Sequence, residues 1–235
     1  MKLTAKYDGL SYKTNDASFQ YHINNGISEP YPDFIALVKK YLNMFPYKNR
    51  TYIDVGSHIG TTALPYSRLY DNVYAYEPNL EMYEFLTENV NINNVNNIKT
   101  KNIAISDEFC KINVRKHGSN SGCFYIEKKD DGEIDCITLD SENIENVDYI
   151  KIDTEGSELL VLKGSVETIK KYKPLIQVEI NGLSDRLFNT KKDDILDFLF
   201  EMNYKIFETI SNNVFLYCPN AVSYTHLTLP TILLV

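Results

Sequence analysis

The chain has 235 residues, of which 43% are hydrophobic and 24% charged, so it can form one domain with a sizeable core but not two comfortable ones. Its net charge of −8 argues against a polyanionic partner, and we expect no nucleic-acid substrate. With no apolar run long enough for a membrane span and no secretory pattern at the N-terminus, the expectation is a cytoplasmic enzyme without a membrane partner.

The four cysteines do not predict a metal site. Cys110, Cys123, Cys136 and Cys218 include no Cys-x-x-Cys pair, and the 13-residue interval between the first three matches no zinc motif. We therefore expect reduced thiols that pack as small apolar side chains, and no metal bound by the protein.

The N-terminal part precedes any clear alternation of strands and helices. Residues 1 to about 28 alternate polar and apolar side chains weakly, as in Phe19–Ile23, which predicts one or two short strands. Between Tyr31 and Phe45 apolar residues recur at helical spacing, and Pro32 suits a first helical turn. We assign residues 1–48 to an N-terminal extension with one amphipathic helix.

Strands and helices alternate from Thr51 onward, and this pattern predicts the domain at 49–220. The alternation indicates a doubly wound α/β fold with a seven-stranded, mostly parallel sheet and an antiparallel strand from a C-terminal hairpin. Such a sheet is typical of Rossmann-like methyltransferases and differs from the all-parallel sheet of nicotinamide-binding domains. The predicted strands are 51–55, 72–76, 97–105, 147–152, 175–180, 205–210 and 214–218, and the predicted helices are 61–70, 79–91, 157–171 and 195–202.

Two segments do not follow this alternation. Residues 106–145 contain short strands, glycine and charge, and we expect them to form a lip over the acceptor site. Residues 221–235 follow the completed hairpin without any Asp, Glu, Lys or Arg and without a clear period, so we expect a non-native or disordered tail.

A glycine-containing turn follows the first buried strand, in Ile53-Asp54-Val55-Gly56-Ser57-His58-Ile59-Gly60. Gly56 allows the chain to turn without a Cβ in the way, and Gly60 allows the next helix to begin close to a ligand. In nicotinamide-binding domains a glycine that makes room for pyrophosphate occupies the place of His58. Asp54 would repel a diphosphate and attract an ammonium group, so a cofactor with an amino-acid end fits this loop better.

Glu77 ends the next strand, in Tyr74-Ala75-Tyr76-Glu77-Pro78-Asn79, 23 residues after Asp54. An acid at this point accepts hydrogen bonds from the two ribose hydroxyls of a nucleoside. Because nicotinamide and adenosyl cofactors both need such an acid, Glu77 predicts nucleoside binding without choosing between them.

Charged residues also gather at the end of the strand at 147–152, in Lys151-Ile152-Asp153-Thr154-Glu155. Lys151 and Asp153 share one face of the strand, and Asp153 ends it in the crevice where open α/β sheets bind ligands. A lone buried ammonium is costly, so Lys151 needs Asp153 or Glu155 as a partner. Glu158 is equally well explained as a residue that stabilises the start of the next helix.

Candidate acceptor contacts lie in two further places. Glu179 and Asn181 end the neighbouring strand, where they fit a capping pair as well as they fit acceptor binding. His117 and Asn120 lie on the predicted lip. His58 is either a wall of the cofactor loop or a proton acceptor.

Several segments, taken in order, resemble the FkbM family of methyltransferases. They are Ile53–Gly60, Tyr76–Pro78, Asn102–Asp107, Ile137–Asp140, Ile150–Glu158, Leu162–Gly164 and Pro174–Ile180. The resemblance covers about Thr51 to Ile180, with a compatible continuation to about Tyr217. It implies S-adenosylmethionine as the methyl donor and O-methylation of a sugar, a glycan or another small hydroxylated acceptor.

The resemblance also implies roles for individual residues. It assigns Asp54, Gly56, Gly60 and Glu77 to the donor site, with Ser106 and Asp107 beside the adenine. Lys151, Asp153 and Glu155 correspond to the active-site signature of the family. Ser57-His58 departs from the usual Ala-Asn, so the contacts that His58 makes to the amino-acid end of the donor are left open.

Methyl transfer to an alcohol requires a group that removes or shares the hydroxyl proton. Asp153 is the first choice for this base, Glu155 the second and His58 the third, with Lys151 as an orienting residue. Nothing in the sequence demands a metal, although the clustered acids could hold Mg²⁺.

Two alternative functions remain. An NAD-dependent oxidoreductase is favoured by Glu77 and the general fold, and an inactive donor-binding protein is favoured by the altered His58 loop. The sequence does not predict the acceptor itself or the oligomeric state.

Overall fold

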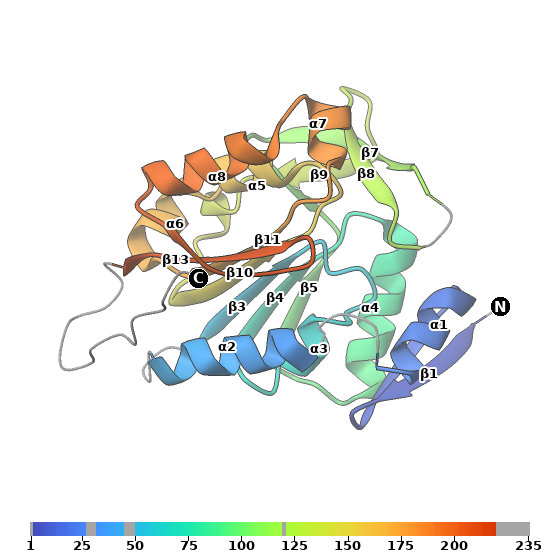
Figure 1. Ribbon diagram of the computed structural model, residues 1–235. Coiled ribbons are helices and arrows are strands. Elements are labelled where there is room, and N and C mark those ends of the chain that lie inside the picture. Colours follow the sequence, from blue (N-terminus) through green and yellow to red (C-terminus); the bar gives the residue numbers. More distant parts are fainter. Residues whose placement is uncertain (1, 27–31, 45–49, 119–120, 220–235) are drawn as a thin grey trace.

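Helices cover both faces of a central sheet in the computed structural model, which describes residues 2–26, 32–44, 50–118 and 121–219 (Figure 1). The tail predicted at 221–235 lies outside the described residues. Within the described ranges, no helix combines the length and the apolar character needed to cross a membrane.

Seven strands form the central sheet, and five adjacent ones run parallel. The last two strands form a hairpin that adds one antiparallel neighbour to the parallel set. The predicted mostly parallel sheet with its C-terminal hairpin is therefore confirmed. In spatial order the strands are β12 (Lys205–Ile210), β13 (Asn213–Tyr217), β11 (Leu175–Glu179), β10 (Val147–Ile152), β3 (Thr51–Val55), β4 (Asn72–Tyr76) and β5 (Ile98–Lys101).

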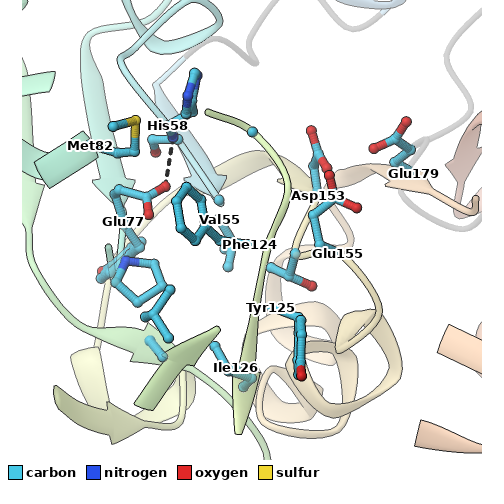
Figure 2. Close-up of a pocket in the computed structure, with 18 of the residues that line it drawn as sticks. Val55, His58, Glu77, Met82, Phe124, Tyr125, Ile126, Asp153, Glu155 and Glu179 are labelled. Carbon is cyan, nitrogen blue, oxygen red and sulfur yellow. Dashed lines mark hydrogen bonds between the residues drawn. The ribbon is translucent and has the colours of Figure 1, made fainter. Parts of the chain in front are cut away.

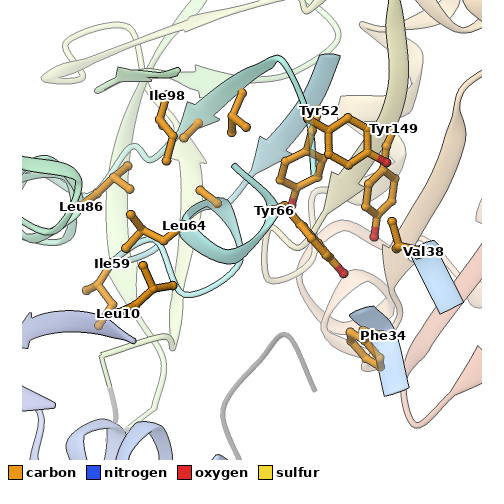
Figure 3. Packing of buried hydrophobic residues seen from close by; sticks show 14 of the residues in the cluster. Leu10, Phe34, Val38, Tyr52, Ile59, Leu64, Tyr66, Leu86, Ile98 and Tyr149 are labelled. Atoms are coloured by element: carbon orange, nitrogen blue, oxygen red, sulfur yellow. The ribbon is translucent and has the colours of Figure 1, made fainter. Parts of the chain in front are cut away.

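Two hydrophobic clusters lie on opposite faces of this sheet because successive strand residues point in opposite directions. Tyr52 belongs to one cluster, with the rings of Tyr66 and Tyr149 at 5.0 and 4.9 Å (Figure 3). Its neighbour Ile53 belongs to the other cluster. The Tyr52 face is covered by α2 (Pro32–Met44), α3 (Ala63–Tyr66) and α4 (Leu80–Ile92). The Ile53 face is covered by α5 (Glu158–Lys163), α6 (Val166–Tyr172) and α8 (Lys192–Glu201).

A second, smaller sheet is built from the segment predicted as a lip. Its order is β6 (Ala104–Ile105), β9 (Ile134–Ile137), β7 (Cys110–Lys116) and β8 (Phe124–Lys128). The single strand predicted at 97–105 is wrong, because β5 ends at Lys101 and β6 joins the second sheet. Asn102 separates them: its side-chain amide donates to the carbonyls of Glu77 and Pro78, both at 2.9 Å, and so holds the chain at the end of β4.

Two predicted helices are shorter than their periodicity indicated. The helix predicted at 61–70 is reduced to the single turn of α3, which contains Pro65, a residue without an N–H to donate. The helix predicted at 157–171 is interrupted at Gly164, where the backbone of Ser106 packs so closely that a Cβ would lie 1.8 Å from it. The new helix α6 begins where the Asp140 carboxylate accepts from two of its backbone N–H groups.

The N-terminal residues form a hairpin and a helix that pack against α4. Strands β1 (Leu3–Tyr7) and β2 (Leu10–Thr14) meet at Asp8-Gly9, both with positive φ, as two-residue hairpin turns require. The one or two short strands predicted within residues 1 to about 28 are confirmed as β1 and β2, but Phe19–Ile23, the run that illustrated the alternation, belongs to α1 (Ala17–Asn24). The Asp16 side chain accepts from two N–H groups at the start of α1, and this cap outweighs the weak alternation. A further short helix, α7 (Leu183–Phe188), follows β11.

Candidate active site

A cavity of about 360 Å³ lies where the central strands end, beneath the second sheet. It is within the size range of small-ligand pockets and opens at the carboxyl edge of the parallel strands. Figure 2 shows Glu77, Met82 and His58 on one side of it, and Asp153, Glu155 and Glu179 on the other. The cavity therefore has one end at Glu77 and a second, acidic end at Asp153, Glu155 and Glu179.

Glu77 is the polar centre of the first end. Its two carboxylate oxygens each accept one backbone N–H, from His58 and from Asn79, both at 2.8 Å. Figure 2 shows the bond with His58 as a dashed line. Burial raises the pKa of Glu77 to about 7, assisted by the negative charges of Asp54 and Asp153 and opposed by the two backbone hydrogen bonds. Each oxygen retains a lone pair for a further donor, as binding of two vicinal hydroxyls requires.

The loop after β3 turns sharply to reach this position. Gly56, His58 and Gly60 all have positive φ. A Cβ on Gly56 would lie 1.8 Å from the backbone oxygen of Asp153, so this glycine allows the loop to lie directly against the end of β10. A Cβ on Gly60 would meet the Leu86 side chain at 2.8 Å, so Gly60 serves packing on α4 and does not line the cavity.

Asp54 lies beneath this loop and is fully buried. One of its oxygens accepts from the Thr62 hydroxyl at 2.7 Å, and the other is 3.8 Å from the Lys151 ammonium. Burial raises the pKa of Asp54, and the Lys151 charge opposes that effect. Asp54 supports the floor of the cavity and is not among the residues that line it.

Lys151 and Asp153 form the centre of the acidic end. The ammonium nitrogen of Lys151 is 2.9 Å from Oδ2 of Asp153, and the Lys151 side chain is 3% exposed, which satisfies the predicted need for a partner. Burial alone would raise the pKa of Asp153, but the Lys151 charge and a hydrogen bond with Glu179 outweigh it and hold that pKa below its ordinary value. Because Lys151 already supplies a positive charge here, this acid cluster does not favour Mg²⁺.

Glu155 lies beside Asp153 in a left-handed backbone conformation, with a φ of 54°. Its Oε2 accepts from the side-chain amide of Asn181 at 3.0 Å and lies 3.5 Å from Nε2 of His117. Burial, followed by the negative charge of Asp153, raises the pKa of Glu155 to about 7. The nearby Glu158 accepts from the N–H of Gly156 and from other groups of the turn, so it is a structural cap, as its simplest interpretation predicted.

His58 closes the wall between the N-terminal helix and the second sheet. Its ring lies 4.5 Å from that of Phe19, and its Nε2 is 3.0 Å from the Ser121 hydroxyl. The Ser121 N–H in turn donates to Asp16, the residue that caps α1, at 2.7 Å. Burial lowers the pKa of His58 to about 4, so the imidazole is neutral near pH 7.

The structure brings seven of the predicted site residues into the lining of one cavity: Gly56, His58, Glu77, Lys151, Asp153, Glu155 and Glu179. Five others are not among the lining residues: Asp54, Gly60, Ser106, Asp107 and Asn181. His117 does not line the cavity but lies 3.5 Å from the lining residue Glu155, and Asn120 lies outside the described residues. Asp107 is bound to Lys128 at 3.0 Å, whereas Ala104 and Ile105, just before it, do line the cavity.

The apolar walls of the cavity were not predicted from the sequence. Phe19 and His22 come from α1, and Phe124 and Tyr125 come from the start of β8. The Phe124–Ile126 run was a detectable strand signal within the predicted lip. The sequence around Phe19 gave no sign that this residue lines a cavity, because its position depends on how the N-terminal hairpin and α1 pack against α4.

Residues 54–206 match the family model of the methyltransferase FkbM domain, which is more than half of the chain. The chain belongs to the FkbM methyltransferase family. The resemblance inferred from the ordered motifs is thus confirmed, and the family does not support the nicotinamide oxidoreductase alternative. No curated protein sequence matches the chain.

Solved structures of methyltransferases resemble the FkbM-family chain in fold. The methyltransferase FkbM from Methylobacillus flagellatus KT is 19% identical with a TM-score of 0.51, and the match covers 72% of this chain and 43% of that one. A Staphylococcus aureus protein provisionally identified as a caffeoyl-CoA O-methyltransferase is 13% identical with a TM-score of 0.52, over 85% of this chain and 88% of that one. The chain therefore spans less than half the length of the Methylobacillus protein.

Proposed function

We propose that the chain transfers a methyl group from S-adenosylmethionine to a hydroxyl oxygen of a sugar, a glycan or another small hydroxylated acceptor. The observation that carries this proposal is the division of one cavity between Glu77 at the end of β4 and Asp153 at the end of β10. A nucleoside bound at Glu77 and an acceptor held at Asp153 would meet within that cavity. Membership of the FkbM family and a strand order of the Rossmann-like methyltransferase type support the proposal.

The donor would bind along the loop after β3. Glu77 would accept from both ribose hydroxyls, and the adenine would lie among the apolar side chains of Ile103 and Ile105. The amino-acid end would lie over Gly56 and His58, where the loop approaches β10. S-adenosylmethionine supplies an activated methyl group on a sulfonium, so the protein has to align the acceptor and handle one proton.

Asp153 would accept that proton. As the acceptor oxygen forms its bond to the methyl carbon, the carbon–sulfur bond breaks and its electrons return to sulfur, which leaves S-adenosylhomocysteine. The hydroxyl proton moves to Asp153 and then to solvent. Lys151 holds the Asp153 carboxylate in place at 2.9 Å. His58 is less suited to this role than Glu155, because its Nε2 is already engaged by Ser121.

Donor binding tests the first half of this proposal. S-adenosylhomocysteine is expected to raise the melting temperature of the chain, because a ligand that binds only the folded state stabilises it. Glu77→Ala should remove most of that shift, since the ribose loses its acceptor. Glu84→Gln, on the exposed surface of α4, should retain it. Stabilisation by NAD and not by S-adenosylhomocysteine would contradict the proposal.

Donor binding is also expected to weaken as the pH falls below about 7. The ionised Glu77 carboxylate accepts from both hydroxyls, and its pKa of about 7 lies above the ordinary value for a glutamate. Acidification from neutral pH therefore removes the binding form, and the affinity for S-adenosylhomocysteine should fall by up to about tenfold per pH unit. Calorimetric titrations between about pH 8 and pH 5.5 measure this dependence. Glu77→Gln should bind weakly at every pH, whereas a flat wild-type profile would show that Glu77 does not control binding.

An inactive donor-binding protein is the remaining alternative to an enzyme. The altered Ser57-His58 pair, the only feature that favours it, closes the wall beside Phe19 and leaves the acidic end of the cavity open. Screening a panel of glycans and small alcohols with labelled S-adenosylmethionine distinguishes the two. Transfer of label to any hydroxyl would support the enzyme.

A further inference from the structure

A histidine, a cysteine and a glutamate meet at the acidic end of the cavity. The coordinating atoms of His117, Cys123 and Glu155 all lie within 4.8 Å of one another. Cys123 and Glu155 line the cavity, and His117 lies directly behind them. These three atoms represent the donor types that zinc and related divalent ions prefer: imidazole nitrogen, thiolate sulfur and carboxylate oxygen.

The β7–β8 hairpin holds the first two of these residues together. The backbone N–H of His117 donates to the carbonyl of Cys123 at 3.0 Å and continues the pairing of Lys116 with Phe124. Residues paired in this way carry their side chains on the same face of the hairpin. A Cβ on Gly118 would lie 2.5 Å from the sulfur of Cys123, so a larger residue there would push the thiol away.

Glu155 approaches the hairpin from the other sheet. Its left-handed backbone, with a φ of 54°, is uncommon for a glutamate. The amide of Asn181 donates to its Oε2 at 3.0 Å and fixes the direction of the carboxylate. Metal-binding carboxylates are commonly oriented by such a second hydrogen bond.

The imidazole supplies an independent indication. Nε2 of His117 is completely buried and has no hydrogen-bond partner, although Oε2 of Glu155 is only 3.5 Å away. A buried polar atom without a partner is costly, and such atoms in folded proteins call for an explanation. The separation of 3.5 Å is close to the spacing of two ligands around one tetrahedral ion with bonds of about 2.0–2.1 Å.

We propose that His117, Cys123 and Glu155 bind one divalent transition-metal ion of the zinc type at the acceptor end of the cavity. Binding would displace the Cys123 proton to solvent and leave a thiolate on the metal. Three protein ligands leave a coordination position open toward the cavity, as in zinc sites that bind a substrate oxygen. This last consequence rests on the proposed function, whereas metal binding itself does not.

Cobalt titration tests the site directly. The full-length chain, without an affinity tag, is reduced, stripped with a chelator and titrated with Co²⁺ under nitrogen. We expect one Co²⁺ per chain and the near-ultraviolet charge-transfer absorption of a thiolate–cobalt bond, which Zn²⁺ should abolish by displacement. A wild-type chain that gives no such absorption overturns the proposal without recourse to any variant.

Two variants then test individual ligands, and a third serves as their control. Cys123→Ser should lose the charge-transfer absorption, and His117→Ala should weaken Co²⁺ binding by at least about tenfold, since even loss of a supporting residue can cost that much. Cys110→Ser, at the opposite end of β7, is the matched control and should behave as the wild type. Unchanged binding by Cys123→Ser, or loss of binding by Cys110→Ser, would overturn the proposal.

The wild-type chain and its variants also allow the metal site and the proposed donor site to be tested independently of each other. The thermal shift with S-adenosylhomocysteine is measured on each variant and also reports whether the variant is folded. A chain that binds S-adenosylhomocysteine and no Co²⁺ refutes only the metal site. A chain that binds Co²⁺ and not S-adenosylhomocysteine refutes only the donor site.

Discussion

Replacing Asp153 with asparagine is expected to slow methyl transfer by about 10²–10⁴-fold and to change the affinity for S-adenosylhomocysteine by less than about tenfold. Asparagine preserves the shape of the side chain and cannot accept the acceptor proton. The donor contacts proposed for Glu77 lie at the other side of the cavity and are not altered (Figure 2). Initial rates with a reactive acceptor and calorimetric affinities measure the two effects separately.

The structural cost of this substitution has to be measured alongside the rate. Lys151 is 3% exposed and would lose its nearest carboxylate, although Asp54 remains 3.8 Å away as a counter-ion. A loss of stability would therefore appear as a lower melting temperature, and donor affinity would still report a folded site.

Glu155→Gln is the matched comparison, because it removes a neighbouring carboxylate with equal conservation of shape. Near-normal turnover by Asp153→Asn, together with an inactive but folded Glu155→Gln, would transfer the proton-accepting role to Glu155. If both variants remain active, a base elsewhere in the cavity becomes the better explanation.

The central fold was predictable because its determinants are local. Buried strands such as Thr51–Val55 are short and rich in apolar residues, and the helices between them carry apolar residues at helical spacing. The strand-end acids follow from the same pattern, since the carboxyl ends of parallel strands meet at one edge. The sequence alone therefore assigns Glu77 and Asp153 to one crevice, and both line the cavity.

Other parts of the site depend on contacts between distant segments. Phe19 reaches His58 because Asn89 of α4 binds the backbone of Lys13, at 2.6 and 3.1 Å, and so holds the N-terminal hairpin in place. The spacing of the cysteines gave no sign of the proposed metal site, because His117 and Cys123 are paired across a hairpin. Their third partner, Glu155, comes from the end of β10. The periodicity of a single segment does not predict which residues of two different sheets come into contact.

Gly56→Ala is expected to be strongly destabilising and to abolish donor binding. The new Cβ would lie 1.8 Å from the backbone oxygen of Asp153 and 2.8 Å from its carbonyl carbon, and neither atom belongs to a flexible side chain. The loop after β3 would have to separate from β10, which would displace both Asp153 and the loop over which the donor is proposed to lie. With the φ of 83° adding a backbone penalty, we expect a loss of about 3 kcal/mol or more and a melting temperature lower by roughly 6–12 °C.

Gly9→Ala distinguishes the steric clash from the backbone conformation. Gly9 has a φ of 74°, similar to that of Gly56, but its Cβ would meet only the Arg68 guanidinium at an ordinary 3.7 Å. This control should lose about 1–2 kcal/mol, the cost of a left-handed alanine, and should bind S-adenosylhomocysteine as the wild type does. Thermal unfolding and calorimetry on both variants provide the comparison. Equal losses of stability with donor binding retained in both would show that the approach of the β3 loop to β10 is not what forms the donor site.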